Sequence, residues 1–80
     1  MKNLTPTQAM NAVKQMKKIR LDVEDGYIDF FIESNGKPTS LVVTEEGTKE
    51  FMADSIGKMR KVFNTPGIKG HMYIVPEVLD

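Results

Sequence analysis

Few side chains in this chain could carry out acid–base or nucleophilic chemistry. His71 is the only histidine and there is no cysteine, so a histidine-activated nucleophile would have to be a serine or threonine. Serines stand at positions 34, 40 and 55, and none lies in a Gly-x-Ser-x-Gly pattern. Paired carboxylates also need a cleft to act as acid and base, which a short chain seldom builds alone. We therefore expect no catalytic residue and predict that the protein is not an enzyme.

A short acidic segment has some of the ligands of a calcium loop. Asp22, Glu24 and Asp25 precede Gly26. A calcium loop needs acids at alternate positions, glycine in the sixth place and a closing glutamate. Counted from Asp22, Gly26 is in the fifth place, so the pattern fails. The segment is interpreted as an acidic turn, with no metal site and no cofactor.

The composition limits the classes of partner. The chain has 80 residues, with 11 basic and 11 acidic side chains and a formal net charge of zero. This balance argues against a strongly basic nucleic-acid binder and against an acidic mimic of DNA. No apolar run has the length of a membrane span, and the first residues lack a signal-peptide pattern. We expect a complete, cytoplasmic protein with one domain, residues 1–80.

Two amphipathic helices are predicted. The first begins after Thr5, with Pro6 in the first helical position and Gln8 completing a capping box. Its apolar stripe consists of Ala9, Ala12, Val13 and Met16. The second begins within residues 44–48, where acids favour a helix start, and ends at Asn64. Its apolar face consists of Met52, Ile56, Met59 and Phe63.

Four strands are predicted from alternating apolar residues, at 19–23, 27–33, 41–43 and 71–75. Asn35 and Gly36 suit a tight turn between the second and third strands. The element order is then α-β-β-β-α-β, an α+β class with a mainly antiparallel sheet and two helices packed on one face. The last strand is expected either parallel to the third strand or beside the first, and the pattern does not choose between these edges.

The central strand predicts a candidate binding face. Its alternation assigns Ile28, Phe30 and Ile32 to the core and leaves four residues on the outer side. Leu41 and Val43 are assigned to the core, so Val42 is expected to join the outer side. The predicted partner-binding residues are Tyr27, Asp29, Phe31, Glu33, Val42 and Tyr73. Aromatic anchors beside charged residues are typical of protein interfaces, although the C-terminal segment or a homodimer partner would also cover such a face.

The function predicted from this face is binding of a protein or protein complex without catalysis. In size and layout the chain resembles accessory proteins of bacteriophages and mobile elements, including anti-CRISPR and other anti-defence inhibitors. The resemblance covers no diagnostic residue, and it implies inhibition by covering a working surface of a host complex.

Two alternatives remain. One is a nucleic-acid-binding regulator that uses Tyr27, Phe31 and the basic helix ends. The helix-meander-helix order resembles the double-stranded RNA-binding domain in layout. That family has a basic cluster where its second helix begins, whereas this chain has Glu45, Glu46 and Glu50. The other alternative is an enzyme subunit with His71 in a site that forms only between protomers.

Overall fold

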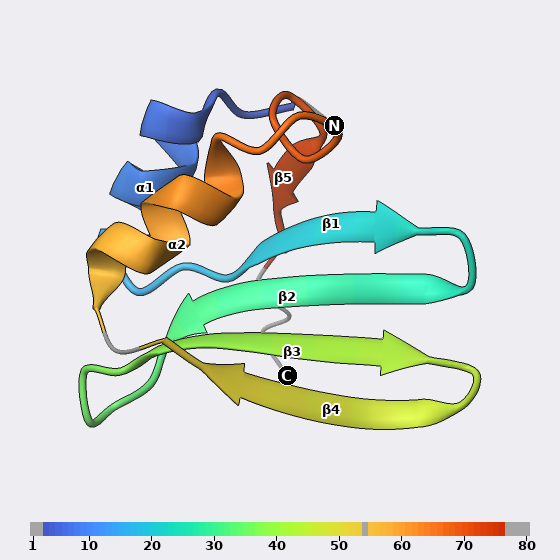
Figure 1. Ribbon diagram of the computed structural model, residues 1–80. Helices are drawn as coiled ribbons and strands as arrows, with labels where there is room; N and C mark the ends of the chain where they lie inside the picture. The colour runs from blue at the N-terminus through green and yellow to red at the C-terminus, as the bar shows by residue number, and fades with distance from the viewer. Residues whose placement is uncertain (1–2, 54, 77–80) are drawn as a thin grey trace.

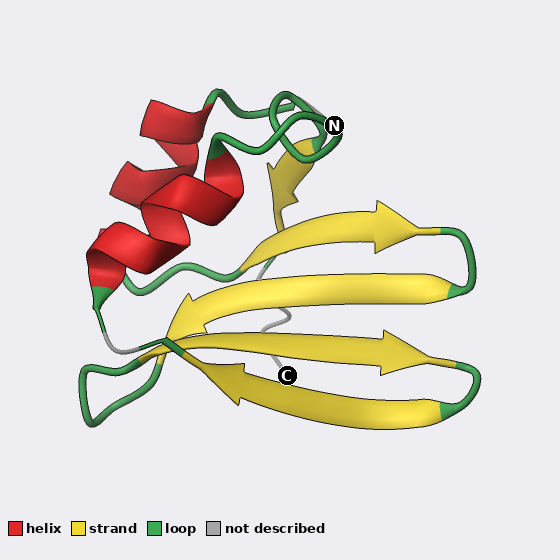
Figure 2. Cartoon of the chain, in the orientation of Figure 1, coloured by secondary structure: helices red, strands yellow, loops and turns green. Residues whose placement is uncertain are grey.

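A five-stranded sheet carries two helices on one of its faces (Figures 1 and 2). The computed structural model describes residues 3–53 and 55–76. In chain order the elements are α1 (Pro6–Lys14), β1 (Ile19–Val23), β2 (Gly26–Ile32), β3 (Pro38–Thr44), β4 (Gly47–Met52), α2 (Ile56–Phe63) and β5 (Met72–Ile74). The predicted α+β class is therefore confirmed, with one strand more than the sequence pattern indicated.

The strands are arranged in the order β4-β3-β2-β1-β5, and all neighbours are antiparallel. The last strand, β5, lies beside β1, with Ile19 opposite Ile74 and Leu21 opposite Met72. Of the two edges that the sequence left open, the chain uses the one next to the first strand. The N-terminal segment pairs with the far side of β5 through the Leu4 amide, which donates to the Met72 carbonyl at 2.7 Å.

The first helix begins as its sequence predicts. The Thr5 hydroxyl accepts a hydrogen bond from the Gln8 amide at 3.1 Å, and the Gln8 side chain accepts one from the Thr5 amide at 2.9 Å. This capping box satisfies two amides that have no partner within the helix. The helix ends at Lys14, so Met16, predicted on the apolar stripe, lies beyond it, with a φ of 64° and 59% of its surface exposed.

The core lies between the helices and β1, β2 and β5. The second helix contributes Phe63, which is fully buried and meets Phe30 edge to face, with 5.1 Å between ring centroids. Such aromatic pairs are favourable beyond the area they bury. The other fully or almost fully buried apolar residues are Ala9, Met10, Ala12, Val13, Ile19, Leu21, Met59 and Met72.

The predicted start of the second helix is wrong. Residues 47–52 form strand β4, and α2 begins only at Ile56, after the N-cap residue Ser55. Gly47 has a φ of 133°, which right-handed helices do not use, and it follows the two-glutamate turn. The free edge of β3 offers backbone hydrogen bonds to this segment, and such tertiary pairing outweighs its modest helix propensity. Met52 therefore belongs to an edge strand and is 53% exposed.

The predicted faces of β3 are also wrong. Val42 lies opposite Ile28, so it shares the helix-facing side of the sheet. Leu41 and Val43, assigned to the core from sequence, lie opposite Asp29 and Tyr27 and point to the outer side. A shift of one residue in strand register moves every side chain to the other face. The alternation was right for β2 and shifted by one residue for β3.

Replacement of Phe63 by alanine tests the core. Because Phe63 is fully buried against Phe30, Phe63→Ala should lower the free energy of unfolding by about 3–5 kcal/mol. Phe51 is the matched control, since it is 56% exposed on β4, and Phe51→Ala should change the stability by less than about 0.5 kcal/mol. Urea denaturation of both variants measures the difference. Equal losses would contradict the placement of the core.

Candidate functional site

The candidate site is the face of the sheet opposite the helices, called here the outer face. Strand pairing places on it Arg20 and Asp22 of β1; Tyr27, Asp29 and Phe31 of β2; Thr39, Leu41 and Val43 of β3; Thr48, Glu50 and Met52 of β4; and Tyr73 of β5. Among the described residues no helix lies on this side (Figure 1). The outer face therefore combines aromatic, aliphatic and charged side chains from all five strands.

Four of the six residues predicted from sequence come together here, namely Tyr27, Asp29, Phe31 and Tyr73. Glu33 follows β2 by one residue, and its amide donates to the Lys37 carbonyl at 3.0 Å. Val42 lies on the opposite side of the sheet. Sequence reasoning missed Leu41 and Val43. Their faces are set by the pairing of residues 33 and 37 across the turn, which places Leu41 opposite Asp29 and Val43 opposite Tyr27.

An ion pair lies in the middle of the outer face. The guanidinium group of Arg20 donates from Nε to Oδ1 of Asp29 at 2.8 Å and from a terminal nitrogen to Oδ2 at 3.1 Å. This two-point geometry is the strong form of the arginine–carboxylate interaction. The hydrogen bonds to Asp29 raise the pKa of Arg20 above its ordinary value. The Asp29 side chain is only 3% exposed and that of Arg20 is 27% exposed, so the cation covers the carboxylate.

Cations also lie over the two aromatic rings that β2 places on the outer face. The Arg20 guanidinium lies 3.8 Å from the centroid of the Tyr27 ring, and the Lys18 ammonium lies 5.2 Å from that of Phe31. Contacts of this kind attract a cation to the face of a ring. Both rings are half-buried. The outer face thus presents two half-buried aromatic side chains, each with a cation over its ring.

A hydrogen bond between β5 and β1 extends the network. The Tyr73 hydroxyl donates to Oδ1 of Asp22 at 2.9 Å, and Tyr73 lies opposite Arg20 in the strand pairing. Desolvation raises the pKa of the Tyr73 phenol above its ordinary value of 10.0, and the hydrogen bond to Asp22 raises it further. The network therefore joins the short last strand to the centre of the sheet through side chains.

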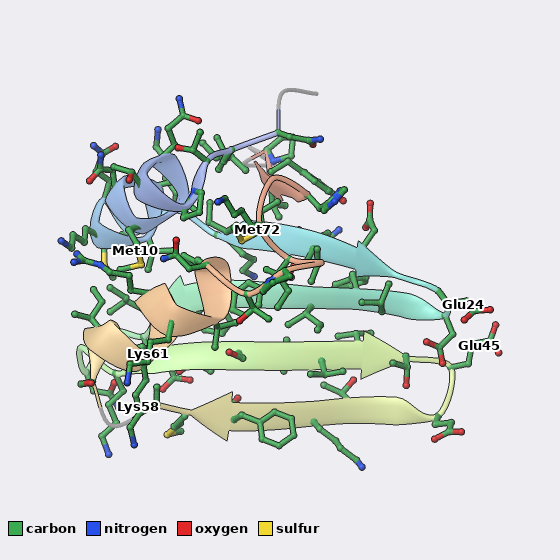
Figure 3. All side chains as sticks on the ribbon, turned by 45° about the horizontal axis from the view of Figure 1, so that its top comes forward. Met10, Glu24, Glu45, Lys58, Lys61 and Met72 are labelled. Atoms are coloured by element: carbon green, nitrogen blue, oxygen red, sulfur yellow. The ribbon has the colours of Figure 1, made fainter. Side chains whose placement is uncertain are left out.

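The charged residues are separated along the length of the strands. Figure 3 shows Glu24 and Glu45 at one end of the sheet, in the β1–β2 and β3–β4 turns, and Lys58 and Lys61 of α2 toward the other end. Asp25 and Glu46 line one hollow at the acidic end. The net charge is zero, but the molecule has an acidic end and a basic end.

The chemistry available to the described residues is limited. In residues 3–53 and 55–76, no three His, Asp or Glu side chains are grouped so that they could hold a metal ion. His71 is exposed in the segment that precedes β5. No helix in the same part of the chain has the length and apolar character needed to cross a membrane. What the outer face does offer is a group of half-buried apolar side chains around the Arg20–Asp29 pair.

No protein-family model, no curated protein and no solved structure matches this chain.

Removal of Arg20 should cost more stability than removal of the charge on Asp29. Arg20→Met leaves a buried carboxylate without its cation, and the free energy of unfolding should fall by about 3–5 kcal/mol. Asp29→Asn should cost less, because the more exposed Arg20 still reaches water. The double variant Arg20→Met/Asp29→Leu should recover most of the loss, since no unpaired charge remains. Chemical denaturation of the three variants checks this order, and an equal or reversed order for the single variants would contradict it.

The phenol of Tyr73 should titrate above pH 10. Because its pKa is higher in the folded chain than in the unfolded chain, its contribution to stability is complete below pH 10 and declines as the pH rises through the folded-state value. Asp22→Ala should bring the pKa of Tyr73 back toward 10. Absorbance titration near 295 nm measures this, with Tyr73→Phe as the control that isolates Tyr27. An unchanged titration curve in Asp22→Ala would refute the role of Asp22.

Proposed function

We propose that this chain is a non-enzymatic, cytoplasmic protein that binds another protein through its outer face. The observation that carries the proposal is the grouping of half-buried apolar side chains on a sheet face that no described helix covers. The group consists of Tyr27, Phe31, Leu41 and Val43, with the exposed Met52 beside them on β4. The Arg20–Asp29 pair lies among these side chains with its charges neutralising each other, and the exposed Asp22 and Glu50 flank the group, as polar residues do around an interface.

The order already present in the free protein supports the proposal. Binding usually costs free energy because side chains lose rotational freedom, and a surface ordered beforehand avoids part of that cost. Arg20 lies over Tyr27 and Lys18 over Phe31, and Arg20 is itself bound at two points by Asp29, so we expect this face to be partly ordered before binding. Aromatic residues and arginine are the side chains that most often dominate protein interfaces.

The proposed mode of action is occlusion. A rigid apolar face on a chain of 80 residues can cover a working surface of a larger complex without any chemistry of its own. This is the mode implied by the likeness in size and layout to phage accessory and anti-defence inhibitors. In its most specific form, the proposal is that this chain is such an inhibitor and that its partner is a protein or protein complex.

Nucleic-acid binding is supported less well by the same geometry. Bases stack on open aromatic faces, whereas Arg20 lies over Tyr27 and Lys18 over Phe31. The charge of Arg20 is also paired with Asp29 and is not available to a phosphate. The exposed carboxylates of Asp22 and Glu50 lie on the same face and would repel a phosphate backbone.

Two neighbouring valines of β3 provide a matched test. Val43 is on the outer face and Val42 on the helix-facing side, and both are half-buried. Val43→Lys should weaken partner binding by roughly 30-fold or more, the effect of losing a central interface side chain, while Val42→Lys should leave binding nearly unchanged. A tagged pull-down with mass spectrometry identifies the partner, and calorimetry with that partner measures both variants.

Two controls make the result decisive. Thermal unfolding must show that both valine variants remain folded. The pull-down is repeated after nuclease treatment and across a range of salt concentrations, because affinity for nucleic acid falls steeply with salt. Loss of binding in Val42→Lys alone would move the site to the other side of the sheet. Recovery that disappears with nuclease would replace the proposal by the nucleic-acid alternative.

A further inference from the structure

The two edges of the sheet differ in whether another segment of the chain pairs with them. At the β5 edge, the N-terminal segment pairs with Met72 through Leu4. At the other edge, β4 is the terminal strand and all six of its residues are exposed. No described segment forms backbone hydrogen bonds with its free edge. An exposed edge strand is a template for pairing with another strand.

The backbone groups that β4 offers can be identified from the pairing pattern. The Ala53 amide donates to the Pro38 carbonyl at 2.9 Å, directly after β4. Hydrogen-bonded and non-hydrogen-bonded pairs alternate along an antiparallel ladder, so Lys49 and Phe51 also turn their backbone polar groups toward β3. Thr48, Glu50 and Met52 therefore turn theirs toward the open edge.

Symmetry limits how two copies of β4 can pair. A two-fold axis perpendicular to the sheet keeps each face on its own side, so a residue near the axis meets the same residue of the other copy. Pairing centred on Lys49 or Glu50 would place like charges directly opposite, which is unfavourable. Pairing centred on Phe51 brings two aromatic rings together and places each Glu50 opposite Met52 of the second copy.

The register centred on Phe51 also uses the exposed apolar surface. Phe51 is 56% exposed on the helix-facing side, where no helix reaches it, and Met52 is 53% exposed on the outer side. Phe51 makes a non-hydrogen-bonded pair in this register, the arrangement in which opposite side chains lie closest. Glu50 and Met52 supply the hydrogen-bonded pairs on either side of it.

The charges at the two ends of β4 are complementary under the same rotation. Glu45 and Glu46 form the turn before β4. At its other end, Lys37 lines a hollow with Met52, Ala53 and Ser55, and Lys61 extends from α2 toward the same end (Figure 3). Antiparallel pairing of two copies turns the acidic end of each toward the basic end of the other. Opposite potentials of this kind favour encounter and fix register.

We infer that the chain forms a two-fold symmetric homodimer through antiparallel pairing of its β4 strands, centred on Phe51. The product is a continuous ten-stranded sheet, five strands from each copy, with both pairs of helices on one side. The two outer faces then lie side by side on the other side. The inference stands on the strand edge alone and does not depend on the proposed binding partner.

The expected affinity of the dimer follows from the small area of its interface. Six edge residues bury little area, and interfaces below about 1,200 Å² are usually weak. Analytical ultracentrifugation of the full chain from about 1 µM to 1 mM should therefore show a reversible monomer–dimer equilibrium with a micromolar midpoint. A monomer at every concentration would overturn the inference. The edge of β4 would then be open for pairing with a strand of another protein.

Cysteine substitutions test the register, since the natural chain has no cysteine. In the inferred dimer the Cα atoms of the two copies of residue 51 are about 4.5 Å apart, within the range of a disulfide. Phe51→Cys should therefore form a disulfide-linked dimer under mild oxidation. Lys49→Cys is the matched control on the same strand and side, and its two copies are separated by about 13 Å along the strands. Preferential cross-linking of Lys49→Cys would overturn the register.

A proline substitution tests the backbone pairing. Glu50→Pro removes an amide that faces the open edge and leaves the β3–β4 hydrogen bonds in place, and proline is tolerated on edge strands for this reason. The dissociation constant should rise by more than tenfold while circular dichroism stays the same. A folded Glu50→Pro variant with unchanged dimerisation would overturn the inference.

Charge reversal is a second measurement that does not involve the backbone. Glu45→Lys/Glu46→Lys and Lys37→Glu/Lys61→Glu should each weaken self-association roughly five- to tenfold at low salt. Their mixture should associate as a heterodimer more tightly than either variant associates with itself. No preference for the mixed pair would overturn the charge-complementary arrangement.

Discussion

Two short helices cannot cover five strands, and the exposed surface of this protein follows from that constraint. The helices have nine and eight residues, and α1 packs on β1, β2 and β5. The pair Phe30–Phe63 joins α2 to the same part of the sheet. Strands β3 and β4 are left beside this core, attached through backbone pairing to β2. In this hairpin β3 is half-buried or buried, whereas β4 is exposed on both sides and along one edge, which is a surface suited to contacts with other molecules.

The elements that the sequence predicted are those specified by local chemistry. The capping box at Thr5 and Gln8 needs only residues within one helical turn, and it formed as predicted. Alternation in residues 19–23 and 27–33 was sufficient to identify β1 and β2 and their helix-facing sides, although β2 ends at Ile32. The class and the placement of both helices on one face follow from the same patterns, because an apolar stripe and an apolar sheet face must cover each other.

The features that could not be predicted depend on contacts between distant segments. Residues 47–52 include good helix formers such as Lys49, Glu50 and Met52, and what makes them a strand is the free edge of β3. The face of Val42 depends on a register set across the turn rather than on its own neighbours. The Arg20–Asp29 pair likewise needs the register that sets Arg20 opposite Asp29, which no pattern within either strand specifies.

The charge network on the outer face constrains what can bind there. Asp29 is satisfied by Arg20, so a partner need not supply a cation to the centre of the face. Arg20 lies over Tyr27 and Lys18 over Phe31, and the apolar surface continues across β3 to Met52. A complementary surface would therefore place a carbonyl or carboxylate oxygen over Lys18 and apolar side chains over β3. That combination of acceptors and apolar groups is found on protein surfaces, whereas a nucleic acid would have to bring its phosphates past exposed carboxylates.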